Sequence, residues 1–241
     1  MYQFTSYAMR SDATALPKYV QLSEMLIREI AAGRLVDGER LPPERAMAAE
    51  LGVAVGTLRK ALGDLEHKGL LERIQGSGNY VRHRSDIVSI YAFFRLELIG
   101  GGGLPTARVL SLDTLPKPAE LPTLGQSETA HRIRRLRFLS GKPVALEEIW
   151  LDGGWATVLD QADLSESLYL TYRTLLGLWI AQAEDHVGVG KCPDWMDQVE
   201  WRIEGTCGLV ERWGRTAEGE TAEYSRTWFD SDMCRYVSRM R

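Results

Sequence analysis

The 241-residue sequence predicts an α+β protein with two structural units, a small helical one followed by a larger one with a mainly antiparallel sheet. Up to about residue 67, apolar residues recur at helical spacing, whereas beyond residue 106 strand-like runs alternate with turn residues. A short polar stretch separates the two. We therefore divide the chain into a flexible arm (1–15), a small unit (16–83), a linker (84–90) and a large unit (91–241).

The first predicted helix covers Pro17–Ala32. A proline in the first turn and Gly33 just beyond the last one are typical start and stop signals. Its apolar residues fall on one face: Tyr19, Leu22, Leu26 and Ile30.

Two further helices are predicted close together, Glu44–Leu51 and Val55–His67, joined by a turn at Gly52. In the second of them, leucines recur at i, i+4 and i+7 and predict a buried stripe: Leu58, Leu62 and Leu65. Thr57, Arg59 and Lys60 then fall on other faces of this helix.

Two apolar runs follow, Leu70–Ile74 and Asn79–Arg82, joined by a Gly-Ser-Gly tip at residues 76–78. Helix, turn, helix and hairpin in this order form the layout of a winged helix-turn-helix. In such motifs the second helix enters the major groove of DNA. A small α/β unit without a nucleic acid partner would show the same periodicity, so the pattern alone leaves both interpretations open.

From Leu16 to Val81 the chain resembles the GntR family of bacterial transcriptional regulators. The runs that carry the resemblance are Tyr19–Leu22, Ile30–Leu35, Leu41–Arg45, Leu51–Val53, Thr57–Leu62, Gly69–Leu71 and Gly76–Val81. The resemblance implies that Arg45, Thr57 and Arg59 face double-stranded DNA and that Gly76 and Gly78 shape the wing tip. The position of Lys60 on the second helix leaves it free to contact DNA as well. Arginine can chelate guanine or clamp a phosphate, and glycine lets the backbone approach closely.

The small unit departs from the family pattern at three places. Pro43 stands where a serine is usual, Ala54-Val55 replaces Ser-Arg at the start of the second helix, and Asn79-Tyr80 replaces Thr-Phe in the wing. Each lost capping hydroxyl is worth about 1 kcal/mol. Because a basic DNA contact is lost too, the operator sequence cannot be taken over from other members.

Charge divides unevenly between the units. Residues 1–84 carry 12 Lys and Arg against 10 Asp and Glu, whereas the remainder carries 17 against 23, and the whole chain has a net charge of −4. A mildly basic small unit suits a reader of phosphate backbones. The modest asymmetry does not decide the matter, since many proteins without a DNA partner show as much.

The three cysteines, Cys192, Cys207 and Cys234, are widely spaced and form no Cys-x-x-Cys motif. We expect reduced thiols rather than a disulfide or a metal site. The N-terminal residues lack the pattern of a signal peptide, and no apolar run reaches the roughly 20 residues of a membrane span. These features predict a cytoplasmic protein without a membrane partner.

The large unit alternates strand-like and helix-like segments. The predicted strands are Ala107–Asp113, His131–Ser140, Pro143–Leu151, Trp179–Val189, Gly208–Thr216 and Thr221–Phe229, with hairpin turns at 141–143 and 217–220. Helices are predicted over Leu164–Leu176 and Asp194–Ile203. Gly100–Gly103 is predicted to be a flexible loop that lacks the Lys-Ser/Thr of a phosphate-binding loop.

This unit resembles the UTRA effector-binding domain found behind some GntR heads, whose α/β fold is that of chorismate lyase. The resemblance rests on Arg135–Arg137, Gly141–Glu147, Ser167–Tyr169, Glu211-Arg212, Ala222–Ser225 and Trp228-Phe229. The combined architecture is similar to the subfamily typified by histidine-utilisation repressors. It implies binding of a small metabolite such as a sugar phosphate, an amino acid derivative, a phosphonate or another carboxylate.

Candidate effector-binding residues cluster on the predicted strands. Arg135 and Arg137 share one face of a strand, because residues two apart point the same way, and Glu147 lies across the hairpin from them. Two interpretations stay open. The arginines either clamp a ligand anion or form internal salt bridges with Glu147 or its neighbour Glu148.

Three more residues have paired interpretations. Ser167, at a predicted helix start, can offer a hydroxyl and backbone donors to an anion, or can be a plain cap. Glu223 and Tyr224 can contact ligand hydroxyl or amino groups, or can be a solvated strand residue beside a core aromatic ring.

One segment bears on the choice of ligand. Where many relatives have a Ser-Phe-Thr-like run, this chain has Phe93-Phe94-Arg95. A bulky ring therefore replaces a small donor, and Arg95 adds a cation. We expect carboxylate ligands to have equal weight with sugar phosphates.

The predicted function is that of a metabolite-responsive repressor that binds a pseudo-palindromic operator as a homodimer. Two alternatives remain open, a DNA-binding protein whose second unit only dimerises and a chorismate lyase-like enzyme. No set of nucleophile, base and acid is legible, and only His131 and His186 lie in the second unit. We therefore expect no catalytic residues, metal or cofactor.

Overall fold

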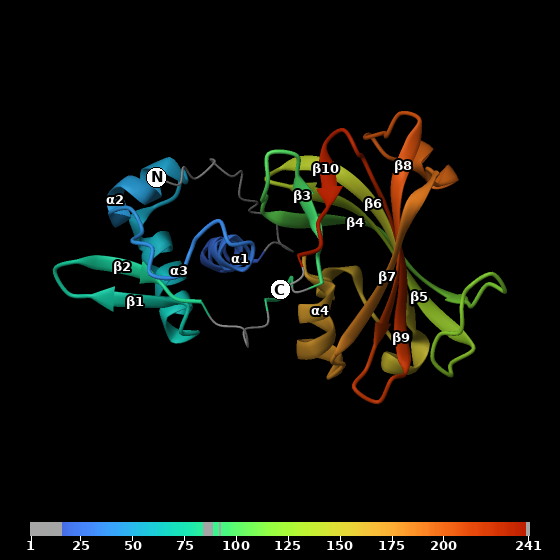
Figure 1. Cartoon of the computed structure of the whole chain (residues 1–241). Coiled ribbons are helices and arrows are strands. Elements are labelled where there is room, and N and C mark those ends of the chain that lie inside the picture. The colour runs from blue at the N-terminus through green and yellow to red at the C-terminus, as the bar shows by residue number, and fades with distance from the viewer. Residues whose placement is uncertain (1–15, 84–88, 92, 240–241) are drawn as a thin grey trace.

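The computed structural model describes residues 16–83, 89–91 and 93–239. The predicted arm and residues 84–88 of the predicted linker lie outside these described residues. Two units stand beside each other, and helix α1 lies between the rest of the first unit and the second (Figure 1). We call residues 16–83 the head and residues 89–239 the body.

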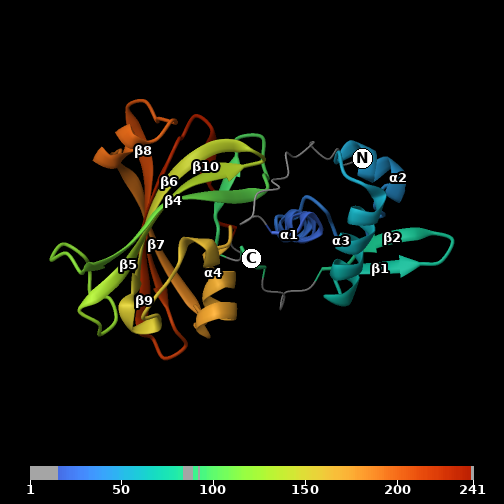
Figure 2. The same cartoon turned by 180° about the vertical axis from the view of Figure 1, so that it is seen from behind.

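The head contains three helices and a two-stranded wing: α1 (Lys18–Ala31), α2 (Glu44–Glu50), α3 (Val55–His67), β1 (Leu71–Ile74) and β2 (Gly78–Val81). The strands pair antiparallel, with Leu71 opposite Val81. The wing extends away from the body (Figure 2). This is the predicted winged helix-turn-helix, with every helix boundary within one residue of its expected position.

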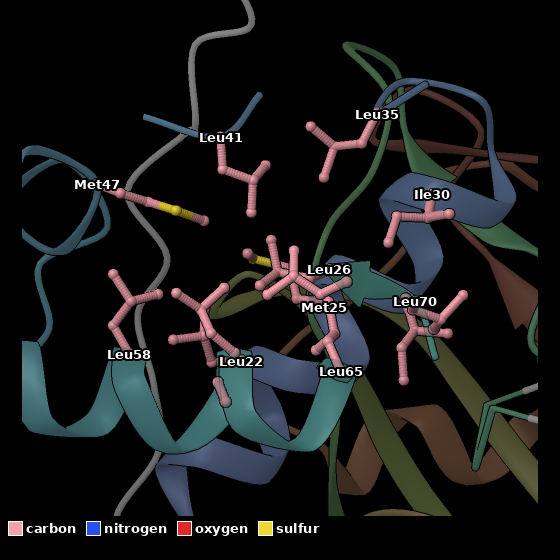
Figure 3. Close-up of a cluster of buried hydrophobic side chains, with 14 of the residues drawn as sticks. Leu22, Met25, Leu26, Ile30, Leu35, Leu41, Met47, Leu58, Leu65 and Leu70 are labelled. Atoms are coloured by element: carbon pink, nitrogen blue, oxygen red, sulfur yellow. The ribbon is translucent and has the colours of Figure 1, made fainter. Parts of the chain in front are cut away.

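The head core lies where α1 crosses α3. Leucines of the predicted stripes meet there, with Leu22, Leu26, Leu58 and Leu65 at most 1% exposed (Figure 3). Tyr19, on the same face of α1, is 37% exposed in the first turn of the helix.

Neither α2 nor α3 receives a side-chain cap. Their N-cap residues are Pro43 and Ala54, which have no hydroxyl to accept a hydrogen bond from the first turn. The caps that the sequence predicted to be missing are therefore missing in the structure, and the two helices depend on packing of their apolar faces.

The body is built on a six-stranded antiparallel sheet in the order β4-β5-β6-β9-β8-β7. Its strands are β4 (Pro105–Pro116), β5 (Thr129–Leu139), β6 (Lys142–Asp152), β7 (Gln182–Lys191), β8 (Thr206–Arg215) and β9 (Thr221–Phe229). All six predicted strands are confirmed, although several are longer than expected and β7 begins three residues later. Short helical segments connect them: η1 (Gly153–Trp155), η2 (Gln161–Asp163), α4 (Leu168–Thr171), η3 (Tyr172–Leu176) and η4 (Asp194–Gln198).

Two strands escaped the sequence analysis, β3 (Leu96–Leu98) and β10 (Cys234–Tyr236), which pair antiparallel beside the main sheet. Each has only three residues, too few for an alternating pattern to be recognised. The glycine run at 100–103 is a turn that leads from β3 toward β4, with Gly101, Gly102 and Gly103 all at positive φ. These are backbone angles that favour glycine.

Two predicted helices are shorter than expected. The segment Leu164–Leu176 begins its helix only at Leu168 and ends in a π-helical turn, and Asp194–Ile203 forms a short 3₁₀ turn that stops at Gln198. Val199 and Ile203 are four residues apart, but they are buried against the sheet from irregular backbone, in a cluster with Trp228. Because a loop packed by one side against the sheet can also bury residues four apart, this spacing wrongly predicted a helix.

The prediction of three reduced cysteines is wrong for two of them. Cys192 and Cys207 form a disulfide, because the antiparallel pairing of β7 with β8 brings together residues 15 apart in the sequence. Cys234 is free and buried. The cysteine pattern therefore carries no argument about compartment. Within the described part of the chain, no helix has the length and apolar character needed to cross a membrane.

Replacing Gly208 by alanine tests the packing of the sheet. A Cβ atom there would meet the ring of Phe229 at 2.1 Å, a distance that requires backbone or ring movement. We expect Gly208→Ala to lower the free energy of unfolding in urea by about 1–3 kcal/mol. Gly188→Ala on the neighbouring strand meets nothing within 4 Å and should leave stability unchanged or slightly raised. Equal changes in the free energy of unfolding for the two variants would contradict the β8–β9 register that places Gly208 opposite Phe229.

Candidate functional site

The body sheet has one face turned toward α4, which we call the inner face. In Figure 1, α4, β3 and β10 lie between the main sheet and the head. Alternation along β5 places Arg135 and Arg137 on this face, and the register sets Arg135 opposite Glu147 of β6. All three residues are at most 8% exposed. The sequence prediction that these residues meet is confirmed.

Arg135 and Glu147 form a tight buried pair. The Arg135 Nε and Nη2 atoms donate to Glu147 Oε2 at 3.0 and 2.6 Å, and Nη1 reaches the carbonyl oxygen of Glu166 at 3.5 Å. Internal pairing, one of the two interpretations left open by the sequence, therefore holds for Arg135. This guanidinium is largely committed to the protein itself.

Arg137 is less well satisfied. Its Nη1 donates to the carbonyl oxygen of Glu166 at 3.2 Å, but its buried Nε has no hydrogen-bond partner in the described chain and lies 3.6 Å from Glu147 Oε1. The ring of Phe94 covers the guanidinium at 4.4 Å from centroid to Cζ. A guanidinium has five N–H donors, so Arg137 keeps capacity for a further acceptor.

Burial and charge act against each other at this site. Burial alone would raise the pKa of Glu147, but Arg135 and Arg137 outweigh it and hold the pKa below its ordinary 4.5, so the carboxylate stays ionised. Burial lowers the pKa of Arg137 despite the charge of Glu147. Burial raises the pKa of Glu223, and hydrogen bonds from nearby tyrosines offset this only in part.

A cavity opens on the inner face beside these groups. The space available to the centre of a water-sized sphere is about 80 Å³, and its lining includes four arginines and three glutamates: Arg95, Arg135, Arg137, Arg212, Glu147, Glu166 and Glu223. Tyr91 also lines it, and its buried hydroxyl has no hydrogen-bond partner among the described residues. A polar cavity with unmatched donors can bind an anion or an acceptor oxygen.

The structure brings most of the other predicted effector residues to the same cavity. Arg95 and Glu223 line it, and so does Ser167. As the N-cap of α4, Ser167 accepts from the Leu170 amide at 3.3 Å, and its hydroxyl donates to the Ile90 carbonyl at 2.8 Å. Ser167 therefore acts as a helix cap, which was one of the two interpretations left open by the sequence.

Tyr224 corrects the prediction. It lies on the opposite face of the sheet, where its ring packs 5.2 Å from that of Trp213 and its hydroxyl donates to Glu211 at 2.5 Å. Successive strand residues point to opposite faces, so Glu223 and Tyr224 cannot both reach one cavity.

Several lining residues were not predicted as site residues, among them Arg212 and Tyr169. Arg212 donates to Asp185 at 2.5 and 2.6 Å, and the Tyr169 hydroxyl donates to Glu223 at 3.0 Å. The alternation that was applied to Arg135 and Arg137 would have found Arg212, since Val210 and Arg212 share the inner face of β8. No local pattern marks Tyr169, which reaches the cavity from α4.

A second candidate surface lies on the head. Arg45, Arg59 and Lys60 are exposed on α2 and α3, and Thr57 is half-buried near the start of α3. Arg59 Nε donates to Glu44 at 2.7 Å across the two helices. At the wing tip, Gly76 and Gly78 adopt positive φ, and the hydroxyl groups of Ser77 and Tyr80 lie 2.6 Å apart. The wing points away from the body, as both overall views show (Figures 1 and 2).

Over residues 16–83, 89–91 and 93–239, no group of three or more His, Cys, Asp or Glu side chains is placed to hold an ion.

Comparison with known families gives two matches that together span most of the chain. Residues 18–81 match the family described as bacterial regulatory proteins of the gntR family. Residues 101–235 match the UTRA domain.

Several curated proteins and solved structures are similar to this chain. The HTH-type transcriptional regulator SmoD of Agrobacterium fabrum is 56% identical over 97% of this chain and 100% of its own length. MngR of Escherichia coli, a mannosyl-D-glycerate transport/metabolism system repressor, is 29% identical over 90% of this chain and 92% of its own. The crystal structure of YydK from Bacillus subtilis has a TM-score of 0.53 at 22% identity, covering 94% of this chain and 100% of that one, which shows a shared fold.

Replacing Glu147 by glutamine tests the buried pair. The variant leaves two buried guanidinium groups without their carboxylate, so we expect a loss of about 3–5 kcal/mol in the free energy of unfolding at pH 7. Because the pKa of Glu147 is lowered by folding, its stabilising contribution is complete above 4.5 and is lost as the pH falls through the folded pKa. The stability difference between the two proteins should therefore shrink in acid.

Glu148→Gln is the matched control for this experiment. Glu148 pairs with Arg134 at 2.8 Å on the outer face, where both side chains are more exposed than the inner pair. We expect a smaller loss than for Glu147→Gln in the same urea titrations. A loss at Glu148 equal to or larger than that at Glu147 would contradict our account of the inner face.

Proposed function

Because the chain belongs to the GntR family of bacterial regulatory proteins, we propose that it is a repressor that binds operator DNA as a homodimer and is controlled by a small anionic metabolite. Its standing as a transcriptional regulator, and not an enzyme, follows from the family and the relatives. The repression, the dimer and the ligand class are the proposed part.

The head supplies the proposed DNA contacts. We assign base or phosphate contacts to Arg45, Thr57, Arg59 and Lys60, and close backbone approach to Gly76 and Gly78 of the wing. Support comes from the exposure of the basic side chains and from their position on the helix pair that precedes the wing. The ion pair between Arg59 and Glu44 would have to open or rearrange for Arg59 to bind a base edge.

A homodimer would match the symmetry of a pseudo-palindromic operator. Two heads related by a two-fold axis would then meet two half-sites on DNA. A ligand changes such binding only if it prefers one arrangement of the heads over another. We propose that the ligand prefers the arrangement that does not fit the operator, so that ligand binding relieves repression.

The observation that carries the ligand proposal is the unsatisfied polar capacity of the inner-face cavity. Arg137 Nε and the hydroxyl of Tyr91 are buried without hydrogen-bond partners in the described chain, and both residues line the cavity. Burying polar groups without partners costs free energy. A ligand with a carboxylate, phosphate or phosphonate group would supply acceptor oxygens to both.

The finer ligand class follows from the other lining groups. Glu223 and Glu166 offer acceptors, which suits ligand hydroxyl or amino groups beside the anionic one. MngR is named for mannosyl-D-glycerate, which combines sugar hydroxyl groups with a carboxylate, and the proposed chemistry for this chain is of that kind. Sugar phosphates and amino acid derivatives remain the other members of the proposed class.

The proposed DNA surface can be tested with Arg59→Ala. The probe is a DNA duplex enriched by the unaltered protein from a randomised library, and fluorescence anisotropy gives its Kd. Loss of a base-contacting arginine should weaken binding by about 1–3 kcal/mol, or roughly 5- to 150-fold. Lys68→Ala, at the other end of α3 and paired with Asp64 and Glu24, should bind within about threefold of the unaltered protein. If Arg59→Ala bound the duplex as tightly as the unaltered protein, the assignment of Arg59 to the DNA-binding surface would be wrong.

The proposed ligand class can be tested by thermal shift. The panel would hold D-glycerate, glucose 6-phosphate, an amino acid and a phosphonate, with neutral glucose as a control. A ligand at a thousand times its Kd adds about 4 kcal/mol of stability, which is several degrees at this size. We expect a shift with at least one anion and its loss in Arg137→Gln, with Arg134→Gln on the outer face as the matched control. Shifts with glucose alone would sink the proposal.

A further inference from the structure

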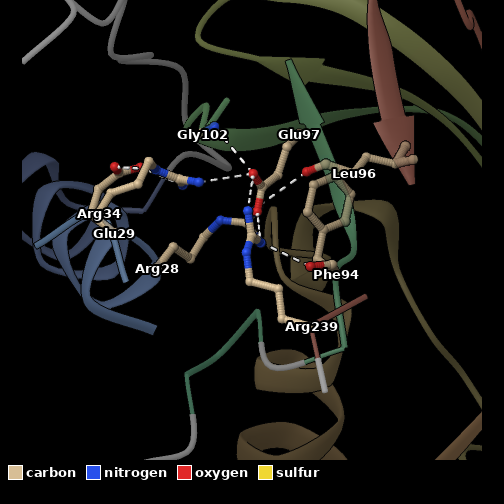
Figure 4. A network of polar contacts seen from close by, with 8 residues as sticks. All are labelled: Arg28, Glu29, Arg34, Phe94, Leu96, Glu97, Gly102 and Arg239. Carbon is tan, nitrogen blue, oxygen red and sulfur yellow. Dashed lines mark hydrogen bonds and ion pairs between the residues drawn. The ribbon is translucent and has the colours of Figure 1, made fainter. Parts of the chain in front are cut away.

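Arg28 of α1 holds the head against the body. Its Nη1 donates to the carbonyl oxygen of Phe94 and its Nη2 to that of Leu96, each at 3.0 Å (Figure 4). Its Cζ lies 5.2 Å from the centre of the Phe94 ring. One side chain of the head thus binds two carbonyl groups of the body, that of Phe94 just before β3 and that of Leu96 at its first residue.

Glu97 fixes the same segment from the other side. The Glu97 carboxylate accepts a hydrogen bond from Arg34 of the head at 3.0 Å. It also accepts two from Arg239 of the C-terminal segment, at 2.6 and 3.0 Å (Figure 4). Burial would raise the pKa of Glu97, but the two arginines lower it to about 2, so the carboxylate is ionised at neutral pH. Arg34 also donates to Glu29 of α1 at 2.6 and 2.9 Å, so Arg34 links α1 to the Glu97 carboxylate of the body.

Phe94 belongs to both the head contact and the cavity. Its ring contacts two guanidinium groups, that of Arg28 at 5.2 Å and that of Arg137 at 4.4 Å. Phe94 and Leu96 both line the cavity, and their carbonyl groups accept hydrogen bonds from Arg28. The wall of the cavity and the docking point of the head are therefore one stretch of chain.

The wall of the cavity that contains Phe94 is the part least fixed by strand pairing. The strands β5 and β6, which carry Arg135, Arg137 and Glu147, are each hydrogen-bonded to a neighbouring strand on both sides. Phe94, in contrast, precedes the short strand β3.

We propose that Phe94 is the positioning residue that couples the cavity to the head. Ligand oxygens that bind Arg137 displace the ring from its place over that guanidinium, and the shift of Phe94 and its carbonyl loosens the grip on Arg28. The inference rests on the proposed ligand site, but the contact chain from Arg137 through Phe94 to Arg28 exists without a ligand.

Hydrogen exchange on the full-length protein without ligand tests this chain. The readout is the exchange of amides 26–35, at the end of α1 and in the turn behind it, where the Arg34 and Leu35 amides donate to Glu29. Phe94→Leu removes the stacked ring and Arg137→Gln removes its cation. Arg137→Gln should speed exchange there about three- to tenfold, the effect of one lost cation–π contact. Phe94→Leu removes the contacts with both Arg28 and Arg137 and should speed exchange at least as much.

Matched controls are available for both variants. Phe93→Leu changes the neighbouring ring, which packs against Tyr169, and Arg134→Gln changes an arginine of the outer face. Neither should alter exchange in residues 26–35. If Arg137→Gln does not fold, Arg137→Lys keeps the charge while removing the planar group that stacks on Phe94.

The outcomes separate this inference from the proposed ligand site. Faster exchange at α1 in both Phe94→Leu and the Arg137 variant supports the coupling, whatever the anion panel shows. Faster exchange in Phe94→Leu alone would mean that Phe94 merely packs against the head, which overturns the coupling. A panel without any anion response would overturn the ligand site while leaving the exchange result standing.

Discussion

The buried guanidinium groups on the inner face of the sheet are the constraint around which this structure is organised. A buried cation is tolerated only when it is paired and hydrogen-bonded. Antiparallel pairing of β5 with β6 satisfies Arg135 through Glu147, whereas the buried Nε of Arg137 has no hydrogen-bond partner in the described chain. This Nε and the hydroxyl of Tyr91 are the polar groups that a ligand could satisfy.

The same constraint reaches the DNA-binding head through one aromatic ring. The ring of Phe94 contacts both Arg137 of the body and Arg28 of α1, and the side chain of Glu97 accepts a hydrogen bond from Arg34 of the head. The head also shares apolar packing with the body, since Leu104 belongs to the cluster formed by α1 and α3. Because the wing points away from this contact, docking leaves the proposed DNA surface open (Figure 2).

Local sequence patterns predicted much of this structure, but the features that depend on contacts between distant segments were not predicted. Helical spacing located all three head helices, and strand alternation located six body strands and the meeting of Arg135 with Glu147. Alternation applied to one strand at a time still grouped Tyr224 with Glu223, although neighbours on a strand must face opposite ways. The disulfide of Cys192 and the link from Arg28 to Phe94 depend on how distant segments pack, which spacing along the chain does not encode.

The most direct test of the central claim is calorimetric titration of an anion that stabilises the protein, first into the free protein and then into its complex with operator DNA. If cavity and head are coupled, DNA must change the affinity for the anion by the same factor by which the anion changes the affinity for DNA. We predict weaker anion binding to the complex, by about 5- to 150-fold for a typical coupling. Equal affinities in both titrations would contradict the account, because they would mean that the cavity and the DNA-binding surface act independently.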